Sequence, residues 1–522
     1  MPRHALRTTA ATAVTAALLA TAACSDDGGG SSSAEDTSSS SISAGSTGTA
    51  LDWGTCPAPD AAQGGGKPPG PEWECATLKV PLDWSKPEGE QIPLALIRTR
   101  AKDEKRRLGS LVFNFGGPGG SGISTLPGAA DEYAALRERY DLVSFDPRGV
   151  GRSAPVLCEN DKQLDAYYAQ DSSPQTPAQQ KAFIDAQRDY REACQRNSGK
   201  VLPYVGTENA ARDLDALRKA LGDEKLNYFG ISYGTELGGV YAHLFPQNVG
   251  RAVFDAVVDP TKDSEQGSLG QAKGFQLALN NFAQDCVERG DACQLQGSTP
   301  KEIEDNIVAL QKSLATKPIP GIGDRKLTES AATGGIAQAL YSKELWPLLE
   351  QGLDEAEGGQ GQLLLALSDA LNGRDQYGRY SNIGAANTAI NCADSKERYS
   401  LEQTKAKLPE FQAASPVFGS FLGWGLLACT GWPVKGAWST PDVSAPGSRP
   451  ILVIGNTGDP ATPYEGARHM VEKLGPGVGV ELTYKGEGHG AYNSGDRCVQ
   501  AAVNGYLLED KVPAAGTVCT AA

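Results

Sequence analysis

The sequence has few histidines and methionines, and it has no long apolar run beyond its N-terminal region. Four histidines and two methionines occur in 522 residues, and no Cys-x-x-Cys pair is present. Zinc sites are built from cysteine and histidine at short spacings, so we expect no metal site, and we expect no other cofactor. A spanning helix needs about 20 apolar residues in a row, and no stretch after the N-terminal region reaches that length. The mature protein is therefore expected to have no transmembrane helix.

Positive charge is also in short supply. The chain has 48 Lys and Arg residues against 63 Asp and Glu residues, which gives a formal net charge of −15. An acidic protein repels phosphate backbones, so nucleic acid is not an expected partner. With 40% hydrophobic and 21% charged residues the composition is that of a globular protein, and it excludes collagen, coiled coils and wholly disordered chains.

The first 50 residues indicate export. Basic residues lead into an apolar run of small residues, as in a secretory signal peptide, which we place at residues 1–23. Cys24 follows, as in a bacterial lipoprotein signal, and the Gly/Ser-rich residues 24–50 are expected to form a disordered tether. Lipidation of Cys24 would hold the protein on the outer face of the cell membrane by a lipid anchor alone. Lipoprotein signals usually have Leu where Thr21 stands, so ordinary cleavage after Ala22 and free secretion is the alternative.

The cysteine count fits an oxidising compartment. Removing Cys24 from the eleven cysteines leaves ten, an even number, as an exported disulfide framework requires. The ten fall into sequential pairs that each lie within one segment of the chain. Sequence alone does not fix the connectivity, and local bridges are the simplest expectation. The expected pairs are Cys56–Cys75, Cys158–Cys194, Cys286–Cys293, Cys392–Cys429 and Cys498–Cys519.

Short apolar runs alternate with helical patterns in the folded part, which begins near Leu51. Such alternation requires crossover connections, and it predicts a mostly parallel sheet with helices on both faces. The expected strands are 92–98, 110–115, 141–145, 226–229, 251–257, 450–454 and 478–484. The expected helices near them are 131–140, 209–221, 235–245 and 464–474.

A long helical block interrupts this alternation after Pro260. Its apolar spacing is typical of helices at 275–286, 303–314 and 345–371. A helical block between strands of one parallel sheet is most simply a lid over the carboxyl edge of that sheet. The predicted architecture is an α/β fold in which residues 51–260 and 446–522 form the core and residues 261–445 an inserted lid, with a helix-rich excursion at 155–205.

The segment Phe229-Gly-Ile-Ser232-Tyr-Gly234 carries a Gly-x-Ser-x-Gly motif. It follows an apolar strand and precedes a helix, which is the context of a nucleophile elbow, and its glycines permit the tight turn that would present Ser232 as a nucleophile. A Gly-rich loop from Asn114 to Gly122 follows an earlier strand. We expect the backbone N–H groups of Gly117 and Tyr233 to form an oxyanion hole. A phosphate-binding loop is the alternative, but the loop lacks both the Gly-Lys-Ser/Thr and the Gly-x-Gly-x-x-Gly patterns.

A base and an acid should follow such a nucleophile along the chain, in the order Ser, acid, His. His489 lies in a Gly-rich loop after the last expected strand, where an imidazole can reach Ser232, and it is the expected base. Asp459 follows the preceding strand and is expected to orient His489. Its alternative role is to cap the helix that starts near Thr462.

Two charged features beside these motifs are interpreted as structural. Asp146, Arg148 and Arg152 follow another expected strand, and we expect an Asp–Arg latch that shapes a loop beside the site. Glu236 lies one helical turn after Ser232, and it too is assigned a structural role.

Six pieces of the sequence, found in one order across residues 52–519, match a known family: Val80–Trp84, Asn114–Gly122, Asp146–Ser153, Gly230–Thr235, Gly458–Pro463 and Gly488–Gly490. They resemble the tripeptidyl and prolyl aminopeptidase branch of the α/β-hydrolases, serine peptidase family S33, and most of all the secreted and lipoprotein tripeptidyl aminopeptidase-like hydrolases of actinomycetes. The resemblance implies an α/β-hydrolase fold, a Ser232/Asp459/His489 triad and a C-terminal segment of that type near residues 390–519. Proline iminopeptidases usually have His where Phe115 stands, which moves the match toward the tripeptidyl type.

The expected activity is that of a serine exopeptidase, which hydrolyses peptide bonds near the free N-terminus of peptides through an acyl-enzyme. A carboxylesterase or lipase with the same triad is the alternative, because fold and triad do not determine the leaving group. A non-enzymatic lipoprotein that binds small molecules or peptides is a third class, and a complete triad in catalytic order argues against it. An exopeptidase also needs carboxylates that meet the ammonium group of its substrate, and we expect these in the acidic lid. The sequence indicates no oligomeric state.

Overall fold

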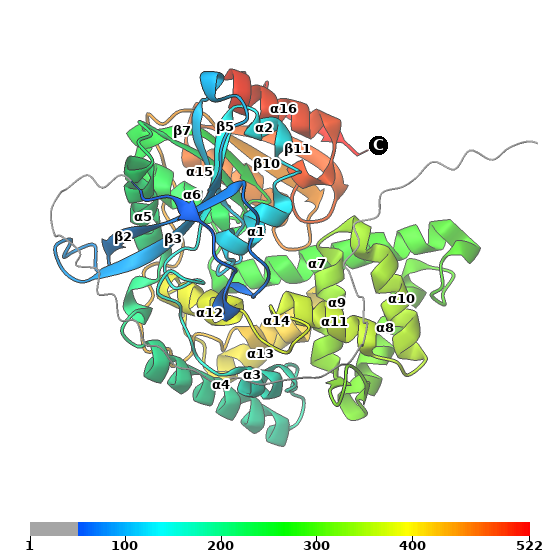
Figure 1. The fold of residues 1–522 in the computed structure, drawn as a ribbon. Coiled ribbons are helices and arrows are strands. Elements are labelled where there is room, and N and C mark those ends of the chain that lie inside the picture. The colour runs from blue at the N-terminus through cyan, green and yellow to red at the C-terminus, as the bar shows by residue number, and fades with distance from the viewer. Residues whose placement is uncertain (1–50, 522) are drawn as a thin grey trace, which may run out of the picture. The chain divides into compact units, whose positions relative to one another are not determined.

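A ten-stranded sheet runs through residues 51–521, the part of the chain that the computed structural model describes (Figure 1). Its strand order is β1-β2-β3-β5-β4-β6-β7-β10-β11-β12. From β5 to β12 in that order neighbouring strands are parallel, whereas β1, β2 and β3 form an antiparallel edge. The strands are β1 Gly54–Thr55, β2 Trp73–Pro81, β3 Gln91–Thr99, β4 Gly109–Asn114, β5 Tyr140–Phe145, β6 Leu226–Ile231, β7 Val249–Asp255, β10 Ile451–Gly458, β11 Gly479–Glu487 and β12 Thr517–Thr520.

Alternate residues of the central strands face two different helical layers. Val112 of β4 belongs to the apolar cluster that includes α5 (Thr207–Ala220), α6 (Tyr233–Leu244) and α15 (Glu465–Leu474). Its neighbours Leu111 and Phe113 belong to the cluster that includes α1 (Gly122–Ala129), α2 (Ala134–Arg137) and α16 (Arg497–Glu509). Every residue of β4 and β5 is buried, as parallel strands covered on both faces require. The predicted α/β class, a mostly parallel sheet flanked by helices, is confirmed.

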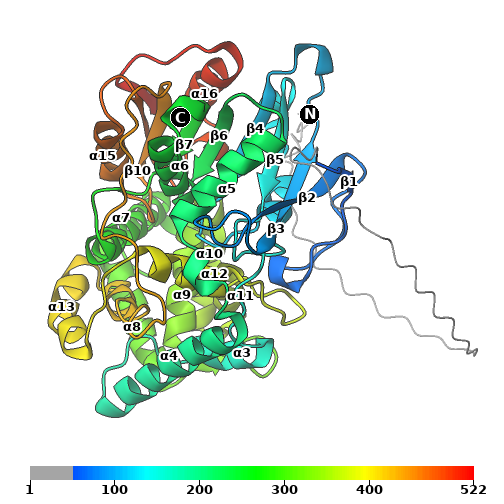
Figure 2. The ribbon, with the colours of Figure 1, turned by 90° about the vertical axis from the view of Figure 1, so that its left-hand side faces the viewer.

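A helical insertion, residues 256–450, separates β7 from β10, although these two strands are hydrogen-bonded neighbours in the sheet. Its helices pack around a core of their own, in which Phe282, Ile336 and Leu364 are fully buried. Figures 1 and 2 both show most of the insertion below the sheet. Its elements are α7 Ser264–Arg289, α8 Pro300–Thr316, β8 Ile319–Pro320, β9 Lys326–Leu327, α9 Glu329–Leu340, α10 Trp346–Glu357, α11 Gln362–Leu371, α12 Ile383–Asp394, α13 Leu401–Ala414 and α14 Gly419–Gly425.

A second helical segment, between β5 and β6, packs on this insertion. It contains α3 (Asp161–Tyr168) and α4 (Pro177–Ser198). Phe183 of α4 lies edge-on to Trp424 of α14, and Arg374 donates to the Asp165 carboxylate at 2.8 Å. The helix-rich excursion expected from the sequence therefore lies against the helices that follow β7.

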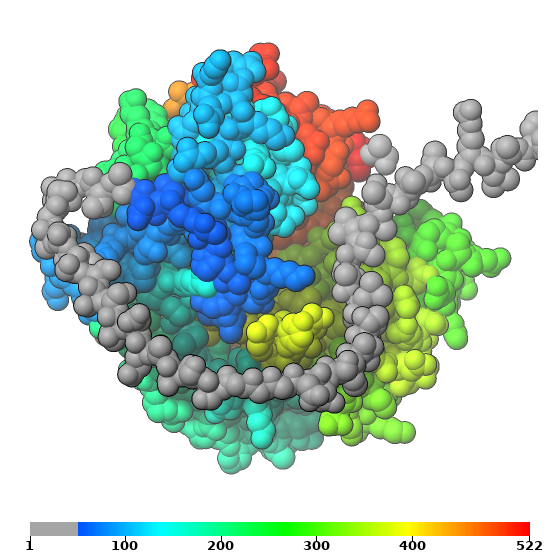
Figure 3. Space-filling model, in the orientation of Figure 1, coloured from blue at the N-terminus to red at the C-terminus, as the bar shows by residue number. Residues whose placement is uncertain are grey.

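The C-terminal helix α16 lies beside the N-terminal part of the sheet. The Tyr140 hydroxyl donates to the Leu507 carbonyl at 2.7 Å, and Arg139 donates to the Leu508 carbonyl at 3.2 Å. In Figure 3 the cyan surface of the early strands accordingly adjoins the red surface of the C-terminal segment. These contacts fix the layer that covers β4 and β5.

Two predicted helices differ from the structure. The span 345–371 is two helices, α10 and α11, because the Gly-Gly-Gln-Gly sequence at 358–361 separates them and glycine disfavours a helix. The span 131–140 contains only the short α2, and Tyr140 already belongs to β5. The carbonyls of residues 137–139 accept N–H groups from the segment 102–108, so they do not continue a helix.

Five disulfides join the described cysteines in the local pairs expected from the sequence: Cys56–Cys75, Cys158–Cys194, Cys286–Cys293, Cys392–Cys429 and Cys498–Cys519. No helix within residues 51–521 is long and apolar enough to cross a membrane. The expected signal peptide, Cys24 and the tether lie outside the described residues.

Candidate active site

Ser232 stands at a sharp turn between β6 and α6. Its backbone angles, φ +58° and ψ −127°, are unusual for a residue with a side chain, and they make this a strained strand-to-helix turn. The turn is also crowded, because a Cβ on Gly230 would lie 2.4 Å from the Gly234 carbonyl oxygen. The geometry is that of a nucleophile elbow, as the motif predicted.

The Gly-rich loop after β4 lies directly against this turn. A Cβ on Gly116 would lie 2.8 Å from Ser232 Cβ and 3.2 Å from the Tyr233 nitrogen. The next residue, Gly117, adopts φ +108°. Neither the Gly117 N–H nor the Tyr233 N–H has an acceptor within residues 51–521. The structure thus brings together the two loops from which an oxyanion hole was expected, with both N–H groups available.

Asp459 and His489 are in direct contact at the carboxyl ends of β10 and β11. His489 Nδ1 lies 2.8 Å from Asp459 Oδ1 and 3.0 Å from Oδ2. The same carboxylate accepts the backbone N–H groups of Ala461 and Thr462, each at 2.9 Å, so it also has the turn-capping role that the sequence left open. With Nδ1 donating to Asp459, the other ring nitrogen, Nε2, is free to accept a proton.

The environment of His489 favours its charged form. Burial opposes a charged imidazole, but the charge and hydrogen bond of Asp459, with a smaller contribution from Asp255, raise the pKa of His489 above its ordinary value. The backbone N–H of His489 donates to the Tyr341 carbonyl at 2.7 Å, and the Tyr341 ring lies edge-on to the imidazole.

In the described chain no hydrogen bond joins Ser232 to His489. Such bonds are often long without substrate and tighten when it binds.

Asp255, which the sequence analysis treated only as part of a strand, links the nucleophile turn to the histidine loop. Its carbonyl accepts the Ser232 N–H at 3.0 Å. Its carboxylate accepts the N–H groups of Ala491 and Tyr492, each at 2.9 Å. Burial, opposed by these N–H groups, raises the pKa of Asp255 to about 6. The only signal in the sequence was an acidic residue at the carboxyl end of an apolar strand.

The expected Asp–Arg latch is not a side-chain pair, although Asp146 does accept the Arg152 backbone N–H at 3.0 Å. Arg148 instead pairs with Asp213 of α5 through two bonds of 2.6 Å, and both side chains are 1% exposed. Asp146 accepts the Ser121 hydroxyl at 2.6 Å and the Gln63 amide at 2.8 Å. Asp146 therefore fixes the end of the Gly-rich loop, while Arg148 ties the loop after β5 to α5.

Helix α12 supports both sides of the expected oxyanion hole. Its Asn387 side chain donates to the Pro118 carbonyl at 3.1 Å. At its other end Asp394 accepts the Thr207 hydroxyl at 2.6 Å, and Thr207 in turn contacts the Tyr233 hydroxyl at 2.5 Å. A helix from the insertion thus positions the Gly-rich loop and the first residue of α6 together.

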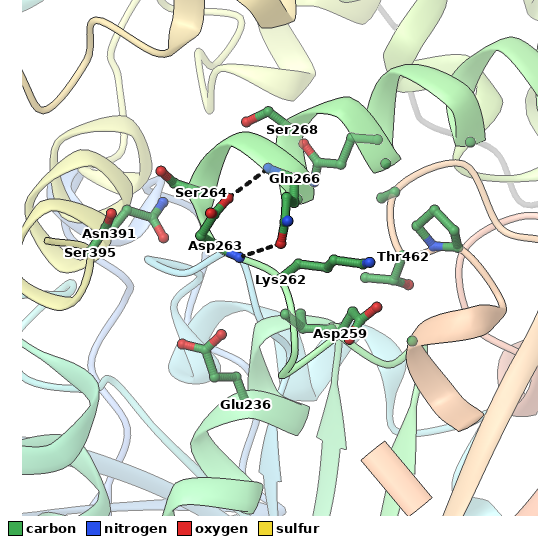
Figure 4. Close-up of a pocket in the computed structure, with 18 of the residues that line it drawn as sticks. Glu236, Asp259, Lys262, Asp263, Ser264, Gln266, Ser268, Asn391, Ser395 and Thr462 are labelled. Atoms are coloured by element: carbon green, nitrogen blue, oxygen red, sulfur yellow. Dashed lines mark hydrogen bonds between the residues drawn. The ribbon is translucent and has the colours of Figure 1, made fainter. Parts of the chain in front are cut away.

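A cavity of about 1000 Å³ lies beside this machinery (Figure 4). Its lining includes Asp459 and Thr462 from the loop after β10, and Asn387 and Asp394 from α12. Glu236 of α6 lies at the bottom of the cavity in Figure 4. The space is large enough for a short peptide or a small organic ligand.

One group of potential metal ligands lies together in residues 51–521. It consists of Asp496, Cys498 and Cys519. Both sulfurs belong to one disulfide, so neither can act as a thiolate ligand.

The chain matches known serine hydrolases along most of its length. A family model described as TAP-like protein matches residues 415–519, and one described as alpha/beta hydrolase fold matches residues 109–296. The serine protease Hip1 of Mycobacterium tuberculosis is 38% identical over 85% of this chain and 87% of its own length. The tripeptidyl aminopeptidase of Streptomyces lividans is 33% identical over 85% and 83%, and the carboxylesterase B of Mycobacterium tuberculosis is 36% identical over 85% and 86%.

These matches, and the fold and elbow described above, agree with the resemblance seen in the sequence motifs. The chain therefore belongs to the TAP-like serine hydrolases of the α/β-hydrolase family.

Proposed function

We propose that the protein is a serine exopeptidase that hydrolyses peptide bonds near the free N-terminus of peptides. The observation that carries the proposal is the contact of His489 Nδ1 with Asp459 at 2.8 Å, at the same sheet edge as the strained Ser232 turn. The names of two relatives, serine protease Hip1 and tripeptidyl aminopeptidase, support a peptide substrate. Peptides are thus the proposed substrates, and we propose neither a nucleic-acid partner nor a cofactor.

The mechanism follows from the roles of the three side chains. Ser232 Oγ attacks the scissile carbonyl while His489 Nε2 takes its proton, and Asp459 stabilises the imidazolium that forms. The N–H groups of Gly117 and Tyr233 stabilise the negative oxygen of the tetrahedral intermediate. His489 then protonates the leaving amine, which leaves an acyl-enzyme on Ser232. In the second half of the reaction His489 takes a proton from water, the water attacks the acyl group, and His489 returns the proton to Ser232 Oγ as the acyl group leaves.

An esterase is the second candidate function. The relative named carboxylesterase B supports it, and the same triad would cleave an ester bond, whose leaving group needs less protonation. The two functions differ in the requirement for an amine at the substrate N-terminus. That requirement is the property to measure.

A rate comparison tests the proposal. The wild-type protein should cleave a tripeptidyl arylamide with a free N-terminus, and Ser232→Ala should cleave neither that substrate nor a p-nitrophenyl ester. Cleavage of the ester alone would favour the esterase. Cleavage of neither by the wild type would favour the non-enzymatic binding class.

The helices between β7 and β10 are the proposed lid, corresponding to residues 261–445. Their separate apolar core, and the cavity that they share with the Asp459 loop, support this role. Export is supported by five disulfides in the described chain. We further propose a lipid anchor on Cys24, which Cys24→Ser would test, because it should move the protein from the membrane fraction to the medium or leave it unprocessed.

A further inference from the structure

Glu236 projects into the cavity from the helix that follows the nucleophile (Figure 4). It lies one turn of α6 beyond Ser232, so its Cα is about 6 Å further along the helix axis. The same cavity is bordered by Thr462, beside Asp459, and by Asn387, which holds the Gly-rich loop at Pro118. Of the proposed triad, Asp459 lines this cavity, so a ligand there would lie between Glu236 and the acid side of the triad.

The Glu236 carboxylate has no hydrogen bond and no ion pair with any residue in 51–521, and the charge nearest to it in effect is the like charge of Asp394. Three other carboxylates that line the cavity are already engaged, whereas Glu465, which is exposed to solvent, is not. Asp259 lies 2.7 Å from His469 Nδ1, Asp263 accepts the Gln266 N–H at 2.9 Å, and Asp394 accepts the Thr207 hydroxyl. The structural role assigned to Glu236 from the sequence therefore has no polar contact to support it.

The cationic side chains around the cavity do not neutralise Glu236. Figure 4 shows the Lys262 side chain extending toward Thr462, away from Glu236. His469 contacts the Asp259 carboxylate instead. Within the described chain, no lysine, arginine or histidine comes within ion-pair distance of Glu236.

A cation in this position would relieve an unfavourable charge. Burial, and after it the nearby Asp394 carboxylate, raise the pKa of Glu236 to about 8. The protein alone thus stabilises the ionised form of Glu236 poorly, and a positive ligand group would stabilise it and lower that pKa. Glu236 could therefore form an ion pair with a positive group of a ligand in the cavity, since no residue of the described chain forms one with it.

We propose that Glu236 binds a primary ammonium group of the substrate and selects for substrates that carry one. This inference rests on the proposed peptidase function, and it assigns the carboxylate to the nucleophile helix, whereas the sequence analysis expected it in the lid. The ammonium can be the free N-terminus or a lysine side chain of the peptide. A peptide residue spans about 3.5 Å, so an N-terminal ammonium one to three residues before the scissile bond lies within range of a carboxylate on this turn.

The test compares matched substrates in wild type and in Glu236→Gln, which keeps the size of the side chain and removes its charge. The first pair is a tripeptidyl arylamide with a free or an acetylated N-terminus, without lysine. The second pair is an acetylated peptide arylamide with lysine or norleucine at one position. We expect the ratio of kcat/KM for the charged to the uncharged member of one pair to fall at least tenfold in Glu236→Gln, mainly through KM, and to recover in part in Glu236→Asp.

Each outcome has a definite meaning. A fall confined to the first pair identifies the N-terminus as the source of the ammonium, and a fall confined to the second identifies lysine. If the kcat/KM ratio of charged to uncharged substrate stays at its wild-type value in both pairs, the proposal is overturned. This holds even where Glu236→Gln cleaves both members of a pair more slowly by the same factor. Glu465→Gln is the matched control, because Glu465 lines the same cavity but is exposed, and its ratios should equal those of wild type.

A second measurement separates this proposal from that of the peptidase. An aminoacyl p-nitrophenyl ester and its acetylated form differ by the same ammonium group, yet they need no peptidase activity. If the wild type cleaved only esters, the peptidase proposal would fail, and the ratio for the two esters would still show whether Glu236 recognises the ammonium.

Discussion

Asp255 holds the backbone of Ala491 in place, with its carboxylate 2.9 Å from the Ala491 nitrogen, two residues after His489. Because the Asp255 carbonyl also accepts the Ser232 N–H, one residue at the end of β7 sets the spacing between the proposed nucleophile and the proposed base. The proposed triad thus depends on a fourth residue, an aspartate that does not take part in proton transfer.

Asp255→Asn should weaken the site without unfolding the protein. An amide presents one N–H₂ group where Ala491 and Tyr492 both need an acceptor, so we expect kcat/KM to fall roughly tenfold, equivalent to about 1.4 kcal/mol. The Asp255 charge also helps to raise the pKa of His489, so the acidic limb of the pH profile should move to lower pH. A variant with wild-type rates and an unmoved limb would contradict this role.

Ser232→Ala should fold normally and lose nearly all activity. A neutral hydroxyl is a weak nucleophile that acts through His489, and removing it leaves only the oxyanion hole and binding to assist water. Steady-state rates on an arylamide, with circular dichroism to check folding, provide the measurement. Turnover above a few per cent of wild type would show that another residue is the nucleophile.

Activity should fall on the acidic side of neutrality as His489 gains a proton. The pKa of His489 is raised above its ordinary value near 6.5, so the half-maximal point of kcat/KM should lie above about 6.5. Asp459→Asn should shift this point to lower pH while reducing the rate. His469→Gln is the matched control, because His469 also contacts a carboxylate, Asp259, and the limb should not move in that variant.

Arg148→Met should strongly reduce stability. It leaves the Asp213 carboxylate buried without its cation, and breaking a buried pair in this way typically costs about 3–5 kcal/mol. Denaturant unfolding should show a lower midpoint, and Arg148→Met combined with Asp213→Asn should recover part of the loss. Arg106→Met, which breaks an exposed pair with Asp103, should leave the midpoint unchanged.

Removing the Cys392–Cys429 bridge should reduce catalysis more than its position outside the triad suggests. Cys392 belongs to α12, whose Asn387 and Asp394 support the two sides of the expected oxyanion hole. Loss of one oxyanion donor costs about 2.7–4 kcal/mol, so partial loosening should lower kcat by roughly tenfold, about 1.4 kcal/mol. The double Cys→Ala variant of the Cys286–Cys293 bridge, at the end of α7, is the control and should keep kcat.

The sequence predicted those parts of the molecule whose signals are local. Apolar runs at β6 and β10 identify strands by themselves, and a glycine pattern or a histidine in a Gly-rich loop is visible within a few residues. Because the carboxyl ends of parallel strands share one edge, Asp459 and His489 could be expected to approach each other before their contact was known.

The missed features join distant segments. Arg148 and Asp213 are 65 positions apart, and Asp255 and Ala491 are 236 positions apart. In both cases the sequence shows a charged residue at the end of an apolar strand, but it does not show which of many backbone and side-chain groups will face it. The expected Asp–Arg latch is not a side-chain pair, because proximity in sequence is not proximity in space.

The direct pairing of β7 with β10 has a consequence for how this protein can change. Ile451 lies opposite Ala252 and Ile454 opposite Asp255, so the helical insertion leaves at the carboxyl end of β7 and rejoins at the amino end of the neighbouring strand β10. The sheet holds these two ends at a fixed distance, and closing a longer loop between such ends adds only about 0.6 kcal/mol for each doubling of its length. The insertion can therefore change in length, by evolution or by engineering, at little cost in loop closure, provided that the parts which contact the site, such as Asn387 and Tyr341, are kept.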